Sequence, residues 1–405
     1  QADAQLTLAS QPCRYQLLAA GCARQLVAGL VPATTPHNRS QGGLLTALVV
    51  IATLGACQAK ETQPGVASAA TSTNTGTMTA TAPSVMGAPD SQMQAVLDRL
   101  VAFGGKPLET LTAAEARKQH TPADAAMAVM KNQGKSTAPD PAVSSVDRSI
   151  TTAGGVLPVR IYTPTSGAGP FPVVVYYHGG GWVIANKEVY DAGARAMSKM
   201  ADAVVVSVDY RQGPEHKFPA AHDDAYSAYE WVTKNASSIK GDPKRIALAG
   251  ESAGGGLAVA TAIMARDKGI QMPVAIVSVY PIAGTDTTTP SYVENAKAKP
   301  LSRPAMSWFF DNYLNGPQDR SNPRVNLVAA DLKGLPPTTI INAQIDPLRS
   351  DGEILSQKLE AAGVTTSQKT YEGVTHEFFG MGLVVDKASA AQKMAADALK
   401  SAFGG

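Results

Sequence analysis

The sequence predicts an α/β fold in which the strands of a central sheet alternate with helices. Apolar runs rich in β-branched residues occupy positions 171–177 and 338–344, and each has the length of a buried strand. A third apolar run, 245–249, is followed by residues 254–264, whose small apolar side chains are typical of a closely packed helix. Because strand-like and helical segments follow one another along the chain, we expect a layered α/β architecture.

A sharp turn is expected between the strand at 245–249 and the helix that follows it. Gly250–Gly254 has the form G-x-S-x-G, which on a strand–turn–helix connection is a nucleophile elbow. Glycines fit this turn because it is strained and the backbone passes close to itself. Such a turn lifts the Ser252 hydroxyl above the sheet, where a substrate carbonyl can reach it. A chain with 36 glycines can contain this short pattern by chance, so the partners of Ser252 must decide.

The first partner is a base, since a serine hydroxyl becomes a good nucleophile only when its proton is taken, usually by a histidine. On a fold with this elbow the chain order is serine, acid, histidine. His376 is the only one of the six histidines that follows Ser252. It lies in a segment with the pattern of a loop that leaves a final strand. A lone histidine is more often a surface or core residue, but its combination with the elbow favours His376 as the base.

The acid that orients the base should lie between the serine and the histidine, at the end of a strand. Asp346 directly follows the strand predicted at 338–344. Pro347 fixes the turn that presents the carboxylate, because its φ is restricted and it cannot extend a helix backwards. Asp351 is the alternative, but its place in the first turn of the next predicted helix is typical of a charge favoured by the helix dipole. We therefore predict Asp346 as the orienting acid.

Backbone N–H groups are needed to bind the negative charge that develops on a substrate carbonyl oxygen. The strand predicted at 171–177 is followed directly by His178–Trp182. This segment has the HGGG form that supplies such an N–H in lipases and esterases. Glycines let the main chain approach the carbonyl with no Cβ in between. An ordinary flexible turn is the alternative interpretation. We predict Gly180, Gly181 and Ala253 as the three donors, and a structural role for His178.

Taken together, these segments resemble the bacterial hormone-sensitive lipase family of carboxylesterases, over roughly residues 90–405. The resemblance implies an α/β-hydrolase fold, with a mostly parallel eight-stranded sheet flanked by helices and an N-terminal helical cap over the site. It also implies no cofactor, and hydrolysis of short- to medium-chain acyl esters. The matching motifs are His178–Trp182, Val208–Arg211 with Pro214–His216, Phe218–Ala221 with Asp223 and Asp224, Gly250–Gly255, Asp346–Arg349 and His376–Phe378.

Four positions at three places in the chain depart from the family pattern. Glu251 stands where the commonest form has Asp, Gln212–Gly213 replaces Leu-Ala, and His222 replaces an apolar residue. These differences concern the pocket and not the three predicted catalytic residues. The charged residues around them are interpreted as structural braces of the loop beside the oxyanion strand: Asp209, Arg211, Glu215 and Asp224.

Composition excludes several classes of function. Lys and Arg number 35 and Asp and Glu 33, and the net charge of +2 gives no electrostatic argument for nucleic acid or an anionic membrane as partner. No Cys or His spacing typical of zinc occurs, and no G-x-x-x-x-G-K-[ST] loop. The three cysteines all precede the predicted enzyme, so we expect no disulfide within it, which suits an oxidising compartment: Cys13, Cys22 and Cys57.

The N-terminal part has the pattern of a targeting segment. Residues 44–56 form an apolar run too short for a confident membrane span and suited to the h-region of a signal peptide. The run ends at Leu54–Cys57, which looks like a bacterial lipobox, so we predict Cys57 as a lipidated residue of a cell-envelope protein, on the periplasmic side or at the outer membrane. A secreted protein is the alternative localisation. Translation from Val31, with 1–30 as upstream sequence, is part of this hypothesis. A core or cap helix is the alternative.

The rest of the chain divides into three predicted parts after the 1–57 leader. Residues 58–90 are rich in Thr, Ala, Ser and Pro and have the composition of a disordered linker. Residues 91–140 are expected to form the helical cap, with one apolar helix face starting at Met93 and a second helix opened by Thr121. Residues 141–405 are expected to form the α/β-hydrolase core. Trp308–Phe310 could serve either cap packing or substrate contact.

The function predicted from the sequence is that of a serine carboxylesterase without cofactor, acting on a small-molecule ester. Ser252 attacks the ester carbonyl, His376 takes and returns the proton, and Asp346 holds the imidazole. An amidase, peptidase or acyltransferase on the same site is the first alternative, because the three residues do not discriminate among these reactions. A non-catalytic ligand-binding module of the same fold is the second. The sequence leaves the oligomeric state open.

Overall fold

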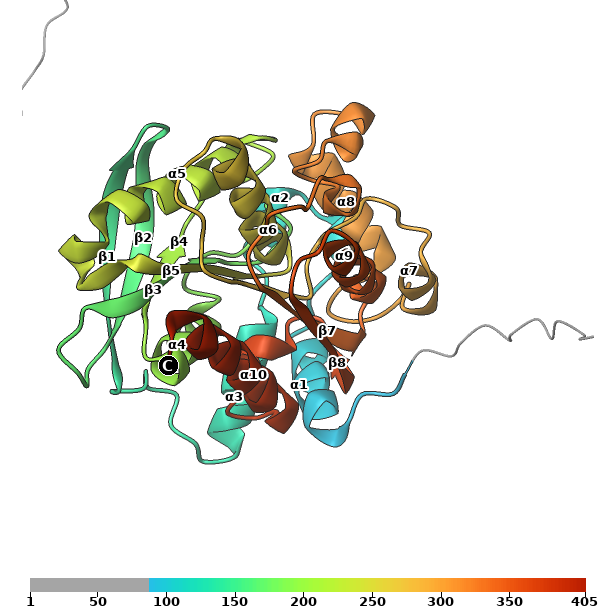
Figure 1. The fold of residues 1–405 in the computed structure, drawn as a ribbon. Helices are drawn as coiled ribbons and strands as arrows, with labels where there is room; N and C mark the ends of the chain where they lie inside the picture. Colours follow the sequence, from blue (N-terminus) through green and yellow to red (C-terminus); the bar gives the residue numbers. More distant parts are fainter. Residues whose placement is uncertain (1–86) are drawn as a thin grey trace, which may run out of the picture. The chain divides into compact units, whose positions relative to one another are not determined.

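The computed structural model describes residues 87–405, which form a single α/β unit (Figure 1). The predicted leader 1–57 with Cys57, and nearly all of the predicted linker 58–90, lie outside the described residues. In the described part, no helix combines the length and the apolar character needed to cross a bilayer.

The core is one eight-stranded sheet with the order β1-β2-β4-β3-β5-β6-β7-β8. The first two neighbour pairs in this order, β1 with β2 and β2 with β4, are antiparallel, and all the others are parallel. The predicted mostly parallel, eight-stranded sheet is therefore confirmed. The strands are β1 Val143–Thr152, β2 Gly155–Pro164, β3 Phe171–Tyr177, β4 Val204–Val208, β5 Gly241–Glu251, β6 Ile276–Val279, β7 Thr338–Ile345 and β8 Thr366–Thr375.

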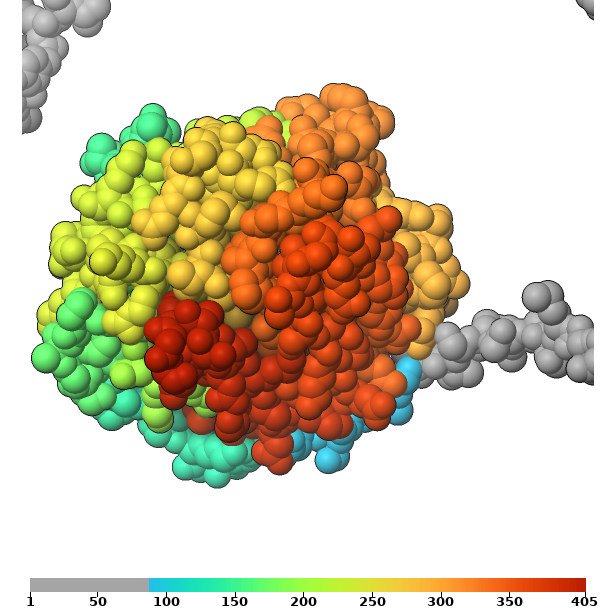
Figure 2. Space-filling model, in the orientation of Figure 1, coloured from blue at the N-terminus to red at the C-terminus, as the bar shows by residue number. Residues whose placement is uncertain are grey.

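Helices cover both faces of this sheet, because successive strand residues point to opposite sides and both sides are apolar. On one face α5, α6 and α9 pack against side chains such as Val173 and Val175, and on the other α1, α3, α4 and α10 pack against Val174 and Tyr176 (Figure 1). The orange and red C-terminal part of the chain covers much of the face seen in Figure 2. The helices are α1 Ser91–Ala102, α2 Ala113–Ala116, α3 Pro122–Asn132, α4 Asp191–Ala201, α5 Ala220–Asn235, α6 Ala253–Asp267, α7 Pro290–Glu294, α8 Arg303–Tyr313, α9 Arg349–Ala361 and α10 Asp386–Phe403.

The N-terminal helices begin where their caps predict. The side chain of Thr121 accepts a hydrogen bond from the N–H of Asp124, and α3 starts at Pro122. In α1, Met93 is fully buried as expected, whereas Val101 in the last turn is 55% exposed. α1 and α3 pack against each other, and the short 3₁₀ helix η1 (Leu108–Thr110) packs against α8.

Strand β1 was not predicted, because its sequence lacks an apolar alternation. It precedes β2 and pairs with it along its whole length. Most β1 side chains are exposed, as is usual for the edge strand of an antiparallel pair. The hairpin adds the antiparallel edge to an otherwise parallel sheet.

Candidate active site

The G-x-S-x-G segment forms the sharp turn between β5 and α6. Ser252 has φ 57° and ψ −120°, a conformation that costs a non-glycine residue on the order of 1–3 kcal/mol. The turn is held by its main chain, since the Ser252 N–H donates to Val279 O at 2.8 Å. A Cβ on Gly250 would lie 2.2 Å from Gly254 O, and one on Gly254 would lie 2.0 Å from Tyr177 O. Both glycines are thus required by close backbone packing.

The structure brings together the three side chains that the sequence selects. His376 Nε2 lies 2.9 Å from Ser252 Oγ, and His376 Nδ1 lies 2.7 Å from Asp346 Oδ2. Ser252 and His376 are each 4% exposed and Asp346 is fully buried. Burial lowers the pKa of His376, but the neighbouring carboxylates, Asp346 foremost, more than offset this effect, so the pKa of the imidazole is raised overall. The ring is therefore a stronger base than an ordinary histidine.

A backbone N–H of its own turn orients Asp346, whereas Asp351, the alternative acid, binds a different loop. The second carboxylate oxygen of Asp346 accepts the N–H of Leu348 at 2.8 Å, which leaves Oδ2 free for the imidazole. Asp351 lies in the first turn of α9, as expected, and accepts the N–H groups of Ala283 and Gly284 at 3.1 and 2.8 Å. Burial raises the pKa of Asp351 to about 7. Asp351 thus braces the loop after β6 and does not contact the histidine.

The HGGG segment turns beside Ser252 with its main chain exposed to the site. Gly180 and Gly181 have φ +93° and +58°. A Cβ on Gly180 would lie 2.1 Å from Ile184 O, and a Cβ on Gly181 2.1 Å from the Phe309 ring. The N–H groups of Gly180, Gly181 and Ala253 have no hydrogen-bond acceptor among residues 87–405. These three N–H groups are therefore unpaired in the described part of the chain, and close packing fixes the positions of Gly180 and Gly181.

A cavity of about 540 Å³ opens above Ser252, His376, Gly180 and Gly181. Its apolar wall comes mainly from α8 and the loops beside it: Ile282, Leu301, Met306 and Phe309. Of the aromatic run 308–310, Phe309 lines the cavity, Trp308 donates its Nε1–H to Leu111 O at 2.9 Å, and Phe310 is buried beside Trp182. The run therefore divides between substrate-facing and packing roles.

Comparison with known proteins identifies the family. A family model described as the alpha/beta hydrolase fold matches residues 174–380. The chain belongs to this α/β-hydrolase family.

Characterised relatives narrow the group further. Carboxylesterase NlhH of Mycobacterium tuberculosis is 41% identical over 251 residues, which cover 61% of this chain and 79% of NlhH. Ethyl acetate hydrolase of Pseudomonas putida is 32% identical over 299 residues, 73% of this chain and 92% of its own. An esterase structure from Pyrobaculum calidifontis superposes with a TM-score of 0.67 at 38% identity, covering 73% of this chain and 95% of that one. The chain is a carboxylic ester hydrolase of the hormone-sensitive-lipase-like group.

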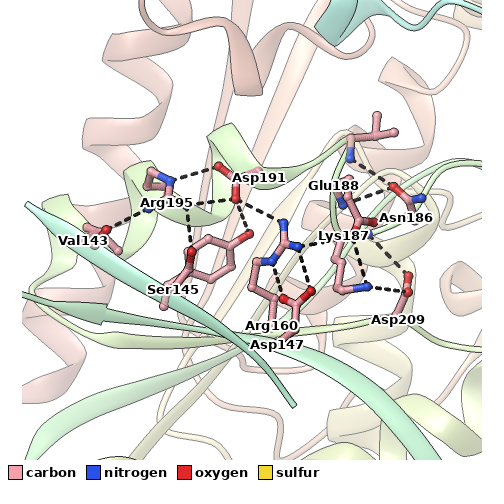
Figure 3. A network of polar contacts seen from close by, with 12 residues as sticks. Val143, Ser145, Asp147, Arg160, Asn186, Lys187, Glu188, Asp191, Arg195 and Asp209 are labelled. Carbon is pink, nitrogen blue, oxygen red and sulfur yellow. Dashed lines mark hydrogen bonds and ion pairs between the residues drawn. The ribbon is translucent and has the colours of Figure 1, made fainter. Parts of the chain in front are cut away.

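A network of ion pairs supports the loop that follows the HGGG segment of this α/β-hydrolase from the sheet edge (Figure 3). Arg160 of β2 binds Asp147 of β1 at 2.6 Å and reaches Glu188 at 3.2 Å. Lys187, the residue before Glu188 in that loop, binds Asp209 at 3.1 Å. Asp209 Oδ1 in turn lies 3.7 Å from the buried Nε2 of the histidine in the HGGG segment. Asp209 thus has the bracing position expected from the sequence.

His178 itself is a buried, neutral part of this support. Its Nδ1–H donates to Gly179 O at 2.8 Å, and its ring stacks on Tyr210 with centroids 4.3 Å apart. Burial lowers the pKa of His178. The ring therefore packs under the glycine turn and does not face the nucleophile.

Sequence reasoning missed Arg117, which ties the N-terminal segment to the active-site loops. Its guanidinium donates to Val183 O at 2.8 Å and to Gly213 O at 2.7 Å, and it pairs with Glu215 at 2.7 Å. The hydrogen bond from Arg117 lowers the pKa of Glu215 to about 2. The partners lie 66 to 98 residues away, so no local pattern indicates the contact.

Two further carboxylates next to the predicted catalytic residues were also missed. Glu251 is buried and accepts hydrogen bonds from the hydroxyls of Tyr176 and Tyr280. Burial raises its pKa to about 7. Glu377 follows the histidine and accepts the hydroxyl of Tyr190 at 2.6 Å. A second cavity, of about 310 Å³, reaches Tyr190 and both glutamates from the side of α3 and α4.

Within residues 87–405, no group of three or more His, Cys, Asp or Glu side chains is arranged to hold a metal ion.

Proposed function

We propose that this carboxylesterase hydrolyses short- to medium-chain acyl esters with Ser252 as nucleophile, His376 as base and Asp346 as orienting acid. One observation supports this above all: the continuous hydrogen-bonded chain from Ser252 Oγ through the imidazole to Asp346, at the floor of a cavity. The order of the roles follows from the contacts. Nδ1–H donates to the carboxylate, so Nε2 is left as the acceptor for the serine proton.

Acylation then proceeds by one nucleophilic addition and one elimination. Ser252 Oγ forms a bond to the ester carbonyl carbon while its proton moves to His376 Nε2. The carbonyl oxygen becomes an oxyanion, which the N–H groups of Gly180, Gly181 and Ala253 bind. When the tetrahedral intermediate collapses, the bond to the alcohol oxygen breaks and Nε2 gives its proton to the leaving alcohol. The acyl group stays on Ser252.

Deacylation repeats the same steps with water. His376 Nε2 takes a proton from water as the water oxygen bonds to the acyl carbon, and the same donors bind the oxyanion. Collapse then breaks the bond to Ser252 Oγ, which takes back the proton from Nε2, and the carboxylic acid leaves.

The expected acyl length rests on the size of the site. A cavity of about 540 Å³ holds a small molecule, and Phe309 with Met306 limits it on the side of α8. Leu108 and Arg117 line the same cavity from the N-terminal segment, which supports a cap role for residues 91–140. We expect turnover of p-nitrophenyl esters to be highest for short and medium acyl chains and to fall for long ones.

Replacement of the nucleophile tests the central assignment. Ser252→Ala should abolish turnover of p-nitrophenyl butyrate and labelling by a fluorophosphonate, while the unfolding midpoint stays near that of the wild type. Retained turnover in the Ala variant would refute Ser252 as the nucleophile. A parallel panel of esters, amides and acceptor alcohols distinguishes an esterase from an amidase, peptidase or acyltransferase, and we expect esters to be the preferred substrates.

We also propose that Cys57 carries a lipid that attaches the enzyme to the cell envelope. The support is the sequence Leu54–Cys57 after an apolar run. Expression of the full chain in a bacterium fed an alkyne-tagged fatty acid should label the wild type and leave Cys57→Ala unlabelled. Equal labelling of the two proteins, or no labelling of the wild type, would contradict this assignment.

A further inference from the structure

The reacting nitrogen of His376 has a second carboxylate beside it. Glu377 Oε1 lies 3.7 Å from His376 Nε2, the atom that faces Ser252 Oγ. Asp346 occupies the other end of the ring, 2.7 Å from Nδ1. The imidazole therefore lies between two carboxylates, one at each nitrogen.

The position of Glu377 is specified by its surroundings. Its carboxylate accepts the hydroxyl hydrogen of Tyr190, the residue that precedes α4. Its backbone has φ +70°, in the left-handed region where glycine is favoured. A side chain that persists in such a conformation at an active site suggests a functional constraint.

Glu377 also differs from the other carboxylates of the substrate cavity. Three carboxylates line this cavity, and two of them have a cationic partner: Asp209 pairs with Lys187 at 3.1 Å, and Glu215 pairs with Arg117 at 2.7 Å. Among residues 87–405, no Lys or Arg lies within 4.0 Å of the Glu377 carboxylate, and its ion-pair partner is His376. Its negative charge is therefore directed to the imidazole.

Resting on the function proposed above, we propose that Glu377 is a positioning residue that acts through His376. Its carboxylate stabilises the protonated imidazole that forms when Ser252 gives up its proton, and it thereby sets the lower end of the pH range in which the enzyme works. In that step the proton moves from Oγ to Nε2 as the Oγ–carbon bond forms, so the positive charge arises next to Glu377. An interaction that strengthens as this charge develops raises kcat and not merely substrate binding.

Several other ionisable groups face this pair. Burial raises the pKa of Glu377, and the neighbouring imidazole and the Tyr190 hydroxyl partly offset the rise. Because Glu377 and His376 interact closely, they titrate as a pair. The remaining groups near the pair are Asp346 after β7, Glu251 at the end of β5 with Tyr176 of β3 and Tyr280 after β6, and Tyr210 after β4. Five more charged side chains line the second cavity: Asp140, Glu188, Asp191, Arg195 and Lys199.

The sign of the pH effect follows from the charges. A carboxylate next to Nε2 raises the pKa of His376, so its removal lowers that pKa. The base is active when it is unprotonated. Glu377→Gln should therefore keep its activity to lower pH than the wild type, while kcat on the plateau falls roughly three- to tenfold because the base is weaker.

The experiment measures kcat and kcat/KM for p-nitrophenyl acetate against pH for the wild type and three variants. Glu377→Gln removes the charge and keeps the size. Glu377→Gly removes the carboxylate and suits φ +70°, so it retains the fold if the Gln variant does not. Glu372→Gln is the matched control, since it removes the same charge from an exposed position on β8. We expect the acid limb to move to lower pH in both Glu377 variants and to stay in place in the control.

A structural role for Glu377 would leave a different signature. It would lower stability or kcat at every pH without moving the acid limb, and profiles of Glu377→Gln or Glu377→Gly that follow the wild type would overturn the proposal. The ¹⁵N NMR titration of the His376 imidazole, assigned with His376→Asn, gives a readout that does not require turnover. Full turnover by Ser252→Ala would refute the proposed function, whereas an unchanged His376 titration in Glu377→Gln would refute this inference alone.

Discussion

Gly181→Ala is the sharpest probe of the oxyanion loop, because the new methyl group has a defined obstacle. A Cβ at this position would lie 2.1 Å from the Phe309 ring, against 3.4 Å for ordinary contact. Either the ring or the loop must therefore move by about 1.3 Å. A displacement of about 1 Å at a reacting centre can cost on the order of 100-fold in rate. Loss of one oxyanion donor costs about 10²–10³ in kcat, or about 2.7–4 kcal/mol.

We therefore expect Gly181→Ala to lower kcat for p-nitrophenyl butyrate by about 10²- to 10³-fold. The backbone also contributes, because Gly181 has φ +58°, where alanine is disfavoured by roughly 1–2 kcal/mol. Gly363→Ala separates the two effects. Gly363 has φ +80°, but a Cβ there meets nothing within 4 Å, so this variant should lose stability and keep its kcat.

Removal of the obstacle should restore part of the activity. In the double variant Gly181→Ala/Phe309→Ala the ring is absent, and kcat should recover at least roughly tenfold over Gly181→Ala, as expected for two residues in direct contact. A single Gly181→Ala variant with wild-type kcat would refute the argument that packing against Phe309 fixes the loop. No recovery in the double variant would show that backbone strain, and not the clash, causes the loss.

Three further predictions follow from the same contacts. Asp346→Asn should lower kcat by about 10⁴-fold, because an amide N–H facing Nδ1 imposes the wrong tautomer, and a loss below tenfold would contradict this role. Wild-type kcat/KM should fall as the pH drops through the pKa of His376, which lies above the ordinary 6.5, because the protonated ring cannot accept the serine proton. A fall in kcat/KM that begins only below pH 6.5 would contradict the raised pKa. Arg117→Ala should lower the free energy of unfolding by about 1–3 kcal/mol in urea titrations, because it removes charged hydrogen bonds to two loop carbonyls. An unchanged unfolding midpoint would show that these hydrogen bonds do not stabilise the fold.

The fold and the contact of Ser252 and Asp346 with His376 were accessible from the sequence because most of the signals behind them are local. Ser252 lies in a short glycine pattern after an apolar run, and Asp346 follows a strand that ends in a proline turn. His376 has no local pattern of its own, but the chain order leaves no other histidine after the serine. Each of these residues lies at or just after the end of a strand, and apolar runs indicate where buried strands lie.

The contacts that the sequence could not predict join distant segments or lack a pattern. Tyr190 and Glu377 are 187 residues apart, and Arg117 reaches Glu215 across 98. The departure at His222 is also explained only in space: its ring lies between the Tyr313 hydroxyl at 2.8 Å and Arg324 O at 3.1 Å, and burial lowers its pKa to about 3. A neutral histidine with both nitrogens bonded can replace an apolar residue because it leaves no polar atom unpaired.

The residues that could be predicted from the sequence and those that could not have different proposed roles in the site. The residues proposed for bond breaking stand on the ends of β5, β7 and β8, whose neighbours in the rigid sheet fix their separation. The residues that shape the cavity and tune the base, Phe309, Arg117 and Tyr190, come from segments outside the sheet and meet the site only through side-chain contacts. Substitutions there should change acyl preference, stability or pH range while the chemistry persists, whereas substitutions at the strand ends should remove the chemistry itself.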